Sequence, residues 1–290
     1  NSQSCNHDWW SSSCGSKKYP FEKQKEIIDK LITSLKSQNI PIIGFVNEDK
    51  LLTEGKVDSR KVNFLRIWFN AGFNLGNHAF SHKSANVIPV EEFKEEIIAG
   101  EKIIRKLIKE NGKQLKYFRH PYLQTGRSLE IKETIEKFLS EYNYTVAPFT
   151  IDNAEWIFAS AYDKAIDSNK TEVMKQIGTE YLNYMKRKIE YWEGQSTVLF
   201  GRNINHVLLI HANSLNAEYF PELCKMILSI NYKFISLDEA LQDGAYQSKD
   251  TFTGGGGISW IHRWAITLGK KKDFFGEEPR VPKFIMMYAG

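Results

Sequence analysis

The sequence predicts an α/β fold in which helices cover a parallel sheet. Short apolar runs typical of buried strands alternate with longer segments whose apolar residues recur at helical spacing. This alternation repeats about six times, and a strand–helix–strand repeat produces parallel strands with the helices outside. The composition, 42% hydrophobic and 26% charged over 290 residues, is ordinary for a globular protein.

The first half of the chain contains the clearest helices. Apolar residues at helical spacing predict a helix over Phe21–Ser37, and the run PIIGFV predicts a buried strand over Pro41–Val46. A second helix follows over Asp58–Phe69, and then a short strand ends at His78. A stripe of Phe and Ile opposite Glu and Lys predicts one long helix over Pro89–Lys109.

The second half repeats the pattern with shorter strands. The expected strands are Tyr117–Phe118, Thr145–Ile151, His206–Ile210 and Lys233–Leu237. The expected helices are Ser128–Tyr142, an interrupted helical region over Ala159–Trp192, Glu218–Ile230 and a short helix through Leu241. A tail with four glycines at Gly254–Gly257 and an aromatic amphipathic piece is expected to pack on the domain.

One strand is absent from this pattern, because the helix at Phe21–Ser37 has no strand before it. A barrel needs that strand in order to close, since open sheet edges are costly. We expect the opening strand either to lie outside these 290 residues, upstream of Asn1, or to be replaced by an element without a strand pattern.

Composition limits the partners. The net charge is +4, and the longest basic run is the lysine triplet at Lys270, so nucleic acid is not an expected partner. No apolar stretch reaches the ~18 to 20 residues of a membrane span. Cys5 and Cys14 either form a small disulfide, which favours an oxidising compartment, or are unpaired like Cys224 on a predicted buried helix face.

Residues suited to chemistry follow four predicted strands: His78 with His82, Arg119, Asp152 and His211. The carboxyl ends of parallel strands meet on one face, where barrel enzymes keep their active sites. Each residue alone has a structural alternative. Arg119 suits an ion pair, Asp152 a helix cap and His211 a satisfied core histidine.

The spacing of His78 and His82 lets both imidazoles face one point, and neutral imidazole is a ligand that zinc favours. A two-histidine site needs a third protein ligand, often a carboxylate, and leaves a position for water. Such water attacks a carbonyl near neutral pH, and His211 suits the acid that protonates the leaving group. Backbone amides near Tyr122 suit a developing oxyanion.

These residues stand in motifs that resemble those of the polysaccharide deacetylases, carbohydrate esterase family 4 with the NodB homology domain. GNHAFSHKS resembles the metal motif H-[ST]-x-x-H, although Ala79 replaces the usual Ser or Thr. RHPY from Arg119, DNAEW from Asp152 and LLIH ending at His211 resemble three further motifs in family order. The resemblance covers roughly residues 20–241.

The resemblance implies a distorted (β/α)7 barrel, a divalent metal, most often zinc, and removal of acetyl groups from an N- or O-acetylated glycan or amino sugar. Carried over by position, His78 and His82 bind the metal and His211 is the catalytic acid. Arg119 orients the base, and Asp152 tunes His211 or braces Arg119. The amide of Tyr122 belongs to the oxyanion hole, and Trp156 and Leu209 shape the acetate pocket.

The chain departs from the family at its first motif, since these 290 residues contain no Asp-Asp pair to supply the base and the third ligand. Asp8 is the nearest stand-in. We expect an irregular segment over residues 1–19, a deacetylase barrel over 20–245 and a C-terminal extension over 246–290. A secreted or periplasmic location is expected.

Three functions compete. The leading one is a metal-dependent carbohydrate deacetylase. The second is a catalytically inactive relative that binds glycan and lacks the Asp-Asp motif. The third, an α/β metallohydrolase of amides or phosphate esters, requires the order of the four motifs to be coincidence.

Overall fold

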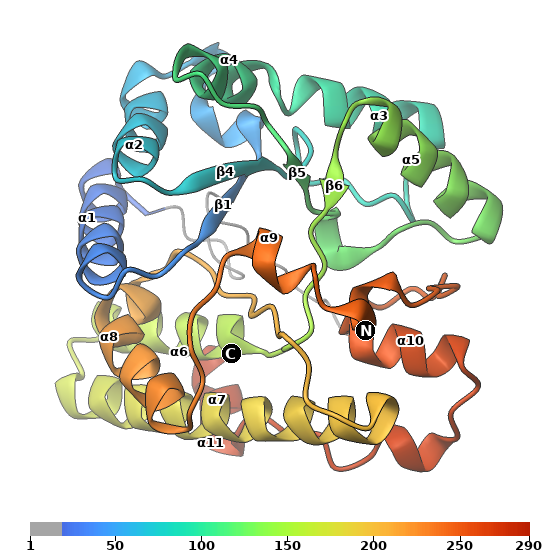
Figure 1. Ribbon diagram of the computed structural model, residues 1–290. Coiled ribbons are helices and arrows are strands. Elements are labelled where there is room, and N and C mark those ends of the chain that lie inside the picture. Colours follow the sequence, from blue (N-terminus) through green and yellow to red (C-terminus); the bar gives the residue numbers. More distant parts are fainter. Residues whose placement is uncertain (1–18) are drawn as a thin grey trace. The chain divides into compact units, whose positions relative to one another are not determined.

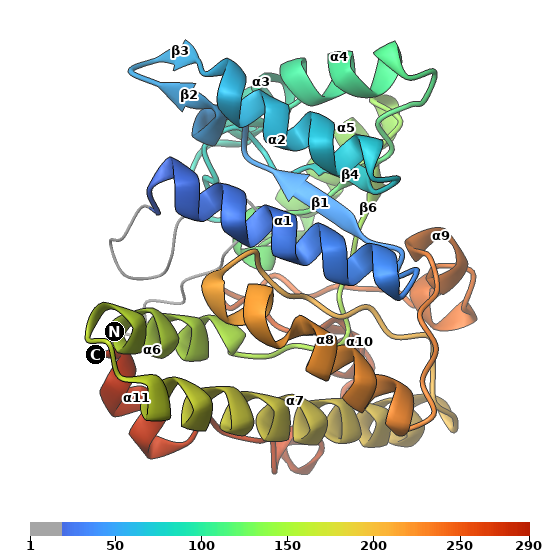
Figure 2. The same ribbon diagram turned by 90° about the vertical axis from the view of Figure 1, so that its left-hand side faces the viewer.

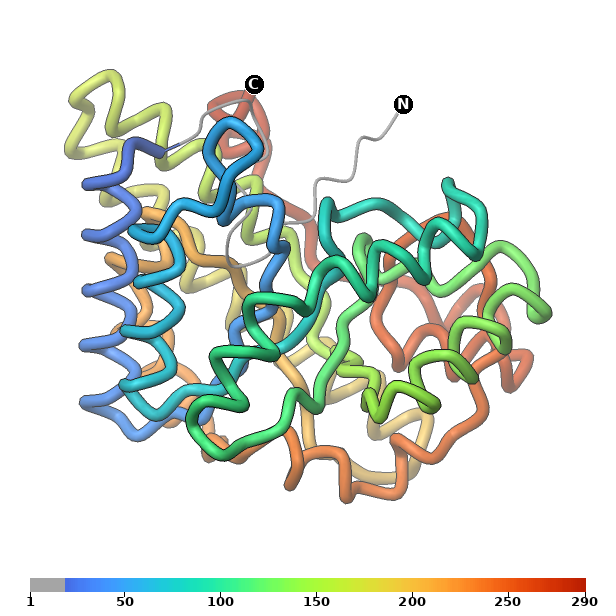
Figure 3. The backbone as a smooth tube through the Cα atoms, turned by 90° about the horizontal axis from the view of Figure 1, so that it is seen from above, coloured from blue at the N-terminus to red at the C-terminus, as the bar shows by residue number. Residues whose placement is uncertain are grey.

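The computed structural model describes residues 19–290, and these form two compact units (Figure 1). Within the described residues, unit 1 comprises Ile42–Pro148 and Thr251–Ile258, and unit 2 comprises 19–41, Phe149–Asp250 and Ser259–Gly290. The continuous course of the chain can be followed in Figure 3. Asp8, Cys5 and Cys14 lie outside the described residues, so the expectations for them and for the irregular N-terminal segment stay predictions. The three-part division of the chain also stays a prediction.

Unit 1 is built on a four-stranded parallel sheet in the order β1-β4-β5-β6. Its strands are β1 (Ile43–Val46), β4 (Asn74–Asn77), β5 (Tyr117–Phe118) and β6 (Thr145–Val146). Val46 pairs with Asn77, Asn77 with Phe118, and Phe118 with Val146, so the four strands end in register. The residues that follow these strands therefore emerge along one sheet edge, as predicted.

Helices connect the strands of this sheet: α2 (Ser59–Asn70), α3 (Val90–Ala99), α4 (Lys102–Glu110) and α5 (Leu129–Glu141). α2 and α4 pack on β4, and α5 packs on β6 and α3. Between β1 and α2 lie the turn η1 (Glu48–Leu51) and the hairpin of β2 (Leu52–Thr53) and β3 (Lys56–Val57), which projects from the unit in Figure 2. The core of the unit contains fully buried Phe64, Trp68, Phe93 and Phe118.

The expected long helix over Pro89–Lys109 is wrong, because the structure divides it into α3 and α4. The division falls at Gly100, where the chain passes close to the loop after β4. A Cβ placed on Gly100 would lie 2.5 Å from the carbonyl carbon of Ala79 and 2.7 Å from the backbone nitrogen of Phe80. The helix thus ends where it contacts the backbone of the histidine loop.

Unit 2 is mainly helical. Its elements are α1 (Phe21–Ser37), α6 (Glu155–Asp167), α7 (Thr171–Phe200), α8 (Ser214–Ser229), α9 (Leu237–Ala240), η3 (Gly244–Gln247), α10 (Trp260–Thr267), η4 (Lys272–Phe275) and α11 (Lys283–Ala289). Figure 2 shows α7 running along α6, and α1 packs on α8. The core contains fully buried Trp192, Trp264, Tyr181 and Phe158. Cys224 is a buried free thiol on α8, and burial raises its pKa to about 12.

Three expected strands are corrected. The strand over Thr145–Ile151 is reduced to the two residues of β6, and His206–Ile210 forms only an isolated parallel bridge between Leu208 and Ile151. Lys233–Leu237 is not a strand, and its residues are exposed or half-buried. An apolar run becomes a strand only where a neighbour pairs its backbone groups.

A closed (β/α)7 barrel is not confirmed, since the strands assigned within residues 19–290 are the four of the parallel sheet and the two of the hairpin. The parallel α/β sheet itself is confirmed. Among the helices of this same range, none is both long and apolar enough to cross a bilayer.

Candidate metal and acid–base site

His78 and His82 lie on the loop that follows β4 in unit 1. The first turn of this loop is fixed from three directions. The His78 amide donates to the carbonyl of Val46 at 3.1 Å, Asn47 Nδ2 donates to the His78 carbonyl at 2.6 Å, and the Ala79 amide donates to Asn77 Oδ1 at 2.8 Å. His78 is 2% exposed and His82 is 8% exposed. Both rings are therefore held in a structured interior rather than on a surface loop.

The backbone conformation of this loop is unusual. Ala79 has φ of 61° and His82 has φ of 60°, in the left-handed region that costs non-glycine residues free energy. Glu96 on α3 offsets this cost, because its backbone carbonyl accepts from the Phe80 amide at 2.9 Å and its carboxylate accepts from the Ser81 amide at 2.7 Å. The loop is thus held in a strained form that places both imidazoles on one side.

The tautomer of His78 follows from its partner. Nδ1 lies 2.6 Å from the backbone carbonyl oxygen of Arg119, which can only accept, so Nδ1 carries the proton. In the neutral ring the lone pair is then on Nε2. A histidine that donates its other ring nitrogen to a carbonyl in this way is oriented as metal ligands usually are. The rings of His78 and His82 lie with centroids 4.9 Å apart.

These two imidazoles fit a divalent metal of the zinc type. The fit is partial, since the described part of the chain brings no group of three or more His, Cys, Asp or Glu residues together as a metal site. If His78 and His82 bind a metal, as the histidines of the H-[ST]-x-x-H motif do, a third protein ligand comes from outside the described residues.

Arg119 and Tyr122 lie beside the histidines in unit 1. The guanidinium of Arg119 stands 4.2 Å from the ring centroid of Phe45, and its Nε donates to the carbonyl of Ala147 at 3.4 Å. Tyr122 lies in η2 (Pro121–Leu123) with φ of 54°, and its ring centroid is 4.4 Å from that of His82. The structure therefore brings together the four predicted site residues of this unit.

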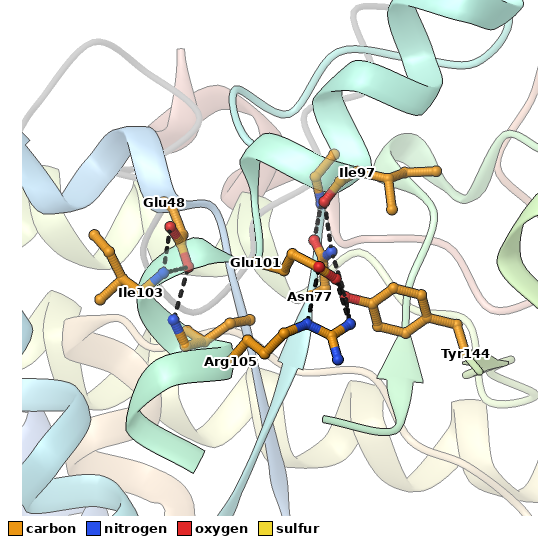
Figure 4. Close-up of polar contacts among 9 residues, drawn as sticks. Glu48, Asn77, Ile97, Glu101, Ile103, Arg105 and Tyr144 are labelled. Carbon is orange, nitrogen blue, oxygen red and sulfur yellow. Dashed lines mark hydrogen bonds and ion pairs between the residues drawn. The ribbon is translucent and has the colours of Figure 1, made fainter. Parts of the chain in front are cut away.

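A buried polar network supports β4 directly behind His78 (Figure 4). Asn77 Nδ2 donates to the carbonyl of Ile97 and to the hydroxyl of Tyr144, both at 2.9 Å. Tyr144 in turn donates to the carboxylate of Glu101, which also accepts from Arg105 Nε at 2.8 Å. Burial raises the pKa of Tyr144, so its hydroxyl remains a donor. The network fixes the residue that precedes the first histidine.

Glu48 forms a second buried contact in the same region (Figure 4). Its Oε1 accepts from the amides of Ile103 at 2.7 Å and Ile104 at 2.8 Å, in the first turn of α4. These amides have no partner within the helix, and a carboxylate there also suits the helix dipole. Burial nevertheless outweighs these bonds and raises the pKa of Glu48 to about 7.

His211 in unit 2 is held by a carboxylate that the motif analysis did not single out. Nδ1 of His211 lies 2.6 Å from Oε2 of Glu155, and Glu155 is fully buried. The other carboxylate oxygen accepts from Asn213 Nδ2 and from Asn216 Nδ2, the latter at 2.6 Å. Asn216 also donates to the backbone carbonyl of His211 at 2.8 Å. The imidazole is thus fixed at both its ring and its backbone.

Asp152 is predicted to tune His211 or brace Arg119, and this role stays a prediction. Its backbone carbonyl accepts from Trp192 Nε1 at 2.8 Å, and its carboxyl group is influenced by Lys188 and Glu278. Burial raises the pKa of Asp152 to about 7, against the opposing effect of Lys188. The bond to His211 comes from Glu155.

The remaining predicted pocket residues, Trp156 and Leu209, are half-buried in unit 2. The carbonyl of Leu209 accepts from Asn153 Nδ2 at 2.8 Å, which joins the DNAEW segment to the segment that carries His211. Glu155 could have been found in the sequence, since it is the acidic residue directly before Trp156 in that segment.

Comparison with known proteins gives matches in one family. The family model described as polysaccharide deacetylase matches residues 19–147. A peptidoglycan-N-acetylglucosamine deacetylase from Bacillus cereus is 27% identical over 136 residues, which are 47% of this chain and 44% of that protein. The chain thus spans less than half the length of this curated relative.

Distant similarity is also found among solved structures. A peptidoglycan deacetylase from Bacillus subtilis has a TM-score of 0.46 at 17% identity, covering 74% of this chain and 85% of that one. A family 4 carbohydrate esterase from Streptomyces lividans, in complex with acetate, has a TM-score of 0.45 at 15% identity, with coverage of 74% and 88%. A family 4 pseudoenzyme from Bacillus anthracis has a TM-score of 0.48 at 13% identity, with coverage of 74% and 60%.

At these scores the structural similarities decide neither the fold nor the activity. The match to the family model is more specific, and the segment that it covers contains both predicted metal ligands, Arg119 and Tyr122. The resemblance indicated by the motifs is therefore confirmed for residues 19–147, which match the model of the polysaccharide deacetylase family.

Proposed function

We propose that this protein is a metal-dependent hydrolase that removes acetyl groups from N- or O-acetylated carbohydrate. The observation that carries the proposal is the geometry of His78. Its Nδ1–H donates to the Arg119 carbonyl, which makes Nε2 the acceptor nitrogen of a buried ring that lies beside the His82 ring, within the segment matched by the family model.

In this proposal His78 and His82 hold a divalent cation, most suitably zinc, because imidazole is a ligand that zinc favours. The chemistry that such a cation supplies when bound is an acidified water and a polarised carbonyl. The amide of Tyr122 donates to the oxygen that gains negative charge. Arg119 orients the base.

His211 protonates the leaving amine or alcohol through Nε2. Glu155 accepts a hydrogen bond from Nδ1–H, which sets the tautomer of His211 and stabilises the ring when it is protonated on both nitrogens. Trp156 and Leu209 shape the acetate pocket. Asp152 tunes His211 or braces Arg119. An acetamido sugar such as that named for the Bacillus cereus relative is the substrate class that we favour.

We further propose that the protein acts outside the cytoplasm, secreted or in the periplasm. Support comes from the polymer named for the same relative, which is a component of the cell wall.

The test is metal content and acetate release from an acetylated chito-oligosaccharide, with His82→Asn as the variant. Asn tolerates the left-handed backbone of residue 82, so the change removes the imidazole with little added strain. His206→Gln, a half-buried histidine of unit 2, is the matched control. We expect near-stoichiometric metal and acetate release in the wild type and the control, and loss of both in His82→Asn. Wild-type protein without metal and without turnover contradicts the proposal.

A second candidate is a glycan-binding relative without catalysis. It is favoured by one observation: the sequence contains no Asp-Asp pair, and no third ligand joins the two histidines among the described residues. Binding of the oligosaccharide in calorimetry, with metal present but no acetate released, would favour this candidate.

A further inference from the structure

The four-glycine stretch lies in the segment Thr251–Ile258 of unit 1, although the chain before and after this segment belongs to unit 2. Unit 1 otherwise ends at Pro148, and the chain returns to it only for Thr251–Ile258. In this segment Gly255 and Gly256 are exposed, while its other residues are half-buried. A segment of eight residues that rejoins a unit so late in the chain needs specific contacts to hold it there, because ordering glycine-rich chain is entropically costly.

Two side chains supply such contacts. Asn86 Nδ2 donates to the carbonyl of Gly254 at 3.2 Å, and Gln124 Nε2 donates to the carbonyl of Gly255. Both side chains also bind the loops that carry the site. Asn86 Oδ1 accepts from the amide of Gly126 at 2.9 Å, and Gln124 Oε1 accepts from the hydroxyl of Ser84. The histidine loop, the Tyr122 loop and the glycine segment are thus joined by one set of hydrogen bonds.

Gly257 makes the closest approach. A Cβ at this position would lie 2.2 Å from the backbone carbonyl oxygen of Tyr122 and 3.4 Å from Cβ of Leu123. The first of these is a backbone atom within a turn, so it cannot move aside as the end of a side chain does. Glycine is therefore required at residue 257 by contact with Tyr122.

The turn that Gly257 contacts is strained. Tyr122 and Leu123 have φ of 54° and 57°, and two consecutive non-glycine residues in the left-handed region are unfavourable for the backbone. The turn itself contributes two hydrogen bonds, from the Leu123 amide to the His120 carbonyl at 3.0 Å and from the Gln124 amide to the Pro121 carbonyl at 3.2 Å. Such a conformation persists only where the surroundings hold it.

We propose that the four-glycine segment is a positioning element of the site, which holds the Tyr122 turn in its strained conformation through contact with Gly257. This inference rests on the proposed function, in which the Tyr122 amide receives the developing negative charge. A donor of this kind works only if it is fixed before the reaction, since reorienting it costs the free energy that it should supply. The same turn also places the Tyr122 ring against His82.

The test compares Gly257→Ala with Gly256→Ala. The added methyl group in the control meets only Cγ2 of Ile258, at an ordinary 3.7 Å, so both variants lose the same chain freedom but only one is pushed against Tyr122. We expect kcat for acetate release to fall about 10- to 100-fold in Gly257→Ala, with KM changed less than about threefold and metal content unchanged. Gly256→Ala should stay within about twofold of the wild type.

Hydrogen exchange of the peptide spanning residues 119–128 gives a second readout that needs no activity. We expect its amides to exchange faster in Gly257→Ala than in Gly256→Ala. Equal exchange in the two variants overturns the positioning role, whether or not the protein is active. If Gly257→Ala exchanges faster than Gly256→Ala but the wild-type protein releases no acetate, the proposed function is refuted and the positioning contact is retained.

Should Gly257→Ala fail to fold, Asn86→Leu replaces it. This change removes the hydrogen bonds of Asn86 to Gly254 and to the Gly126 amide, and keeps the branching and the number of heavy atoms of the side chain. It is expected to lower kcat and speed exchange in the same direction. An unaltered kcat and exchange rate in folded Asn86→Leu contradict the proposal.

Discussion

The contact between Glu155 and His211 allows a quantitative test by Glu155→Gln. The carboxylate is fully buried and accepts from His211 at 2.6 Å, from Asn216 at 2.6 Å and from Asn213. Glutamine has nearly the same shape but only one acceptor oxygen, and its NH2 group donates. Wherever the NH2 group lies, it faces either the ring nitrogen of His211 or the two asparagine amides.

The less costly arrangement keeps the glutamine oxygen toward the asparagines and turns its NH2 group toward His211. The ring must then accept at Nδ1, which moves its proton to Nε2 and gives the wrong tautomer. Hydrogen bonds to charged groups contribute about 1.5–3 kcal/mol, and neutral ones about half as much. We therefore expect the free energy of unfolding to fall by about 1–3 kcal/mol. A histidine in the wrong tautomer costs up to about 10⁴-fold in kcat.

The assays are urea unfolding followed by circular dichroism, and acetate release from the oligosaccharide. The matched control is Glu218→Gln on α8, whose side chain is 52% exposed and paired with Lys30. Exposed pairs of this kind contribute about 0–1 kcal/mol, so the control should be close to the wild type in both assays. Glu155→Gln with the stability of the control and full activity would refute the role assigned to Glu155.

Two further predictions follow from groups outside the acid–base site. The pKa of Glu48 is about 7 in the folded protein against an ordinary 4.5, so the folded state holds a proton that the unfolded state has lost between these values. Stability should therefore fall by up to about 3 kcal/mol as pH rises from 4.5 through 7, and Glu48→Gln should flatten this slope in unfolding measured across the range. On helix α7, a methyl group added at Gly178 would lie 1.9 Å from Cζ of Tyr219, whereas one at Gly194 has no atom within 4 Å. Gly178→Ala should destabilise by about 1–3 kcal/mol, and Gly194→Ala should stabilise by about 0.5–1 kcal/mol, with melting temperatures that move in opposite directions. The same sign for both alanines would show that the α7–α8 contact is not as tight as described.

The sequence by itself determined the elements whose signal is local. The helix over Phe21–Ser37 was predicted with its observed bounds, because a long apolar stripe at helical spacing requires no knowledge of its neighbours. The parallel direction of the strands in unit 1 and the placement of His78 and Arg119 after two of them also followed from alternation alone. The family motifs could be read without any coordinates.

Tertiary structure decided what depends on contacts between distant segments. The expected single helix ends at Gly100 because the backbone of Ala79 passes there, and this contact leaves no periodic trace in the sequence. The carboxylate that contacts His211 Nδ1 is that of Glu155 on α6, and only the structure reveals this contact between α6 and the segment before α8. Lys233–Leu237 has the apolar pattern of a strand. A strand also needs a neighbouring strand for its backbone hydrogen bonds, and the sequence pattern does not show whether one is present.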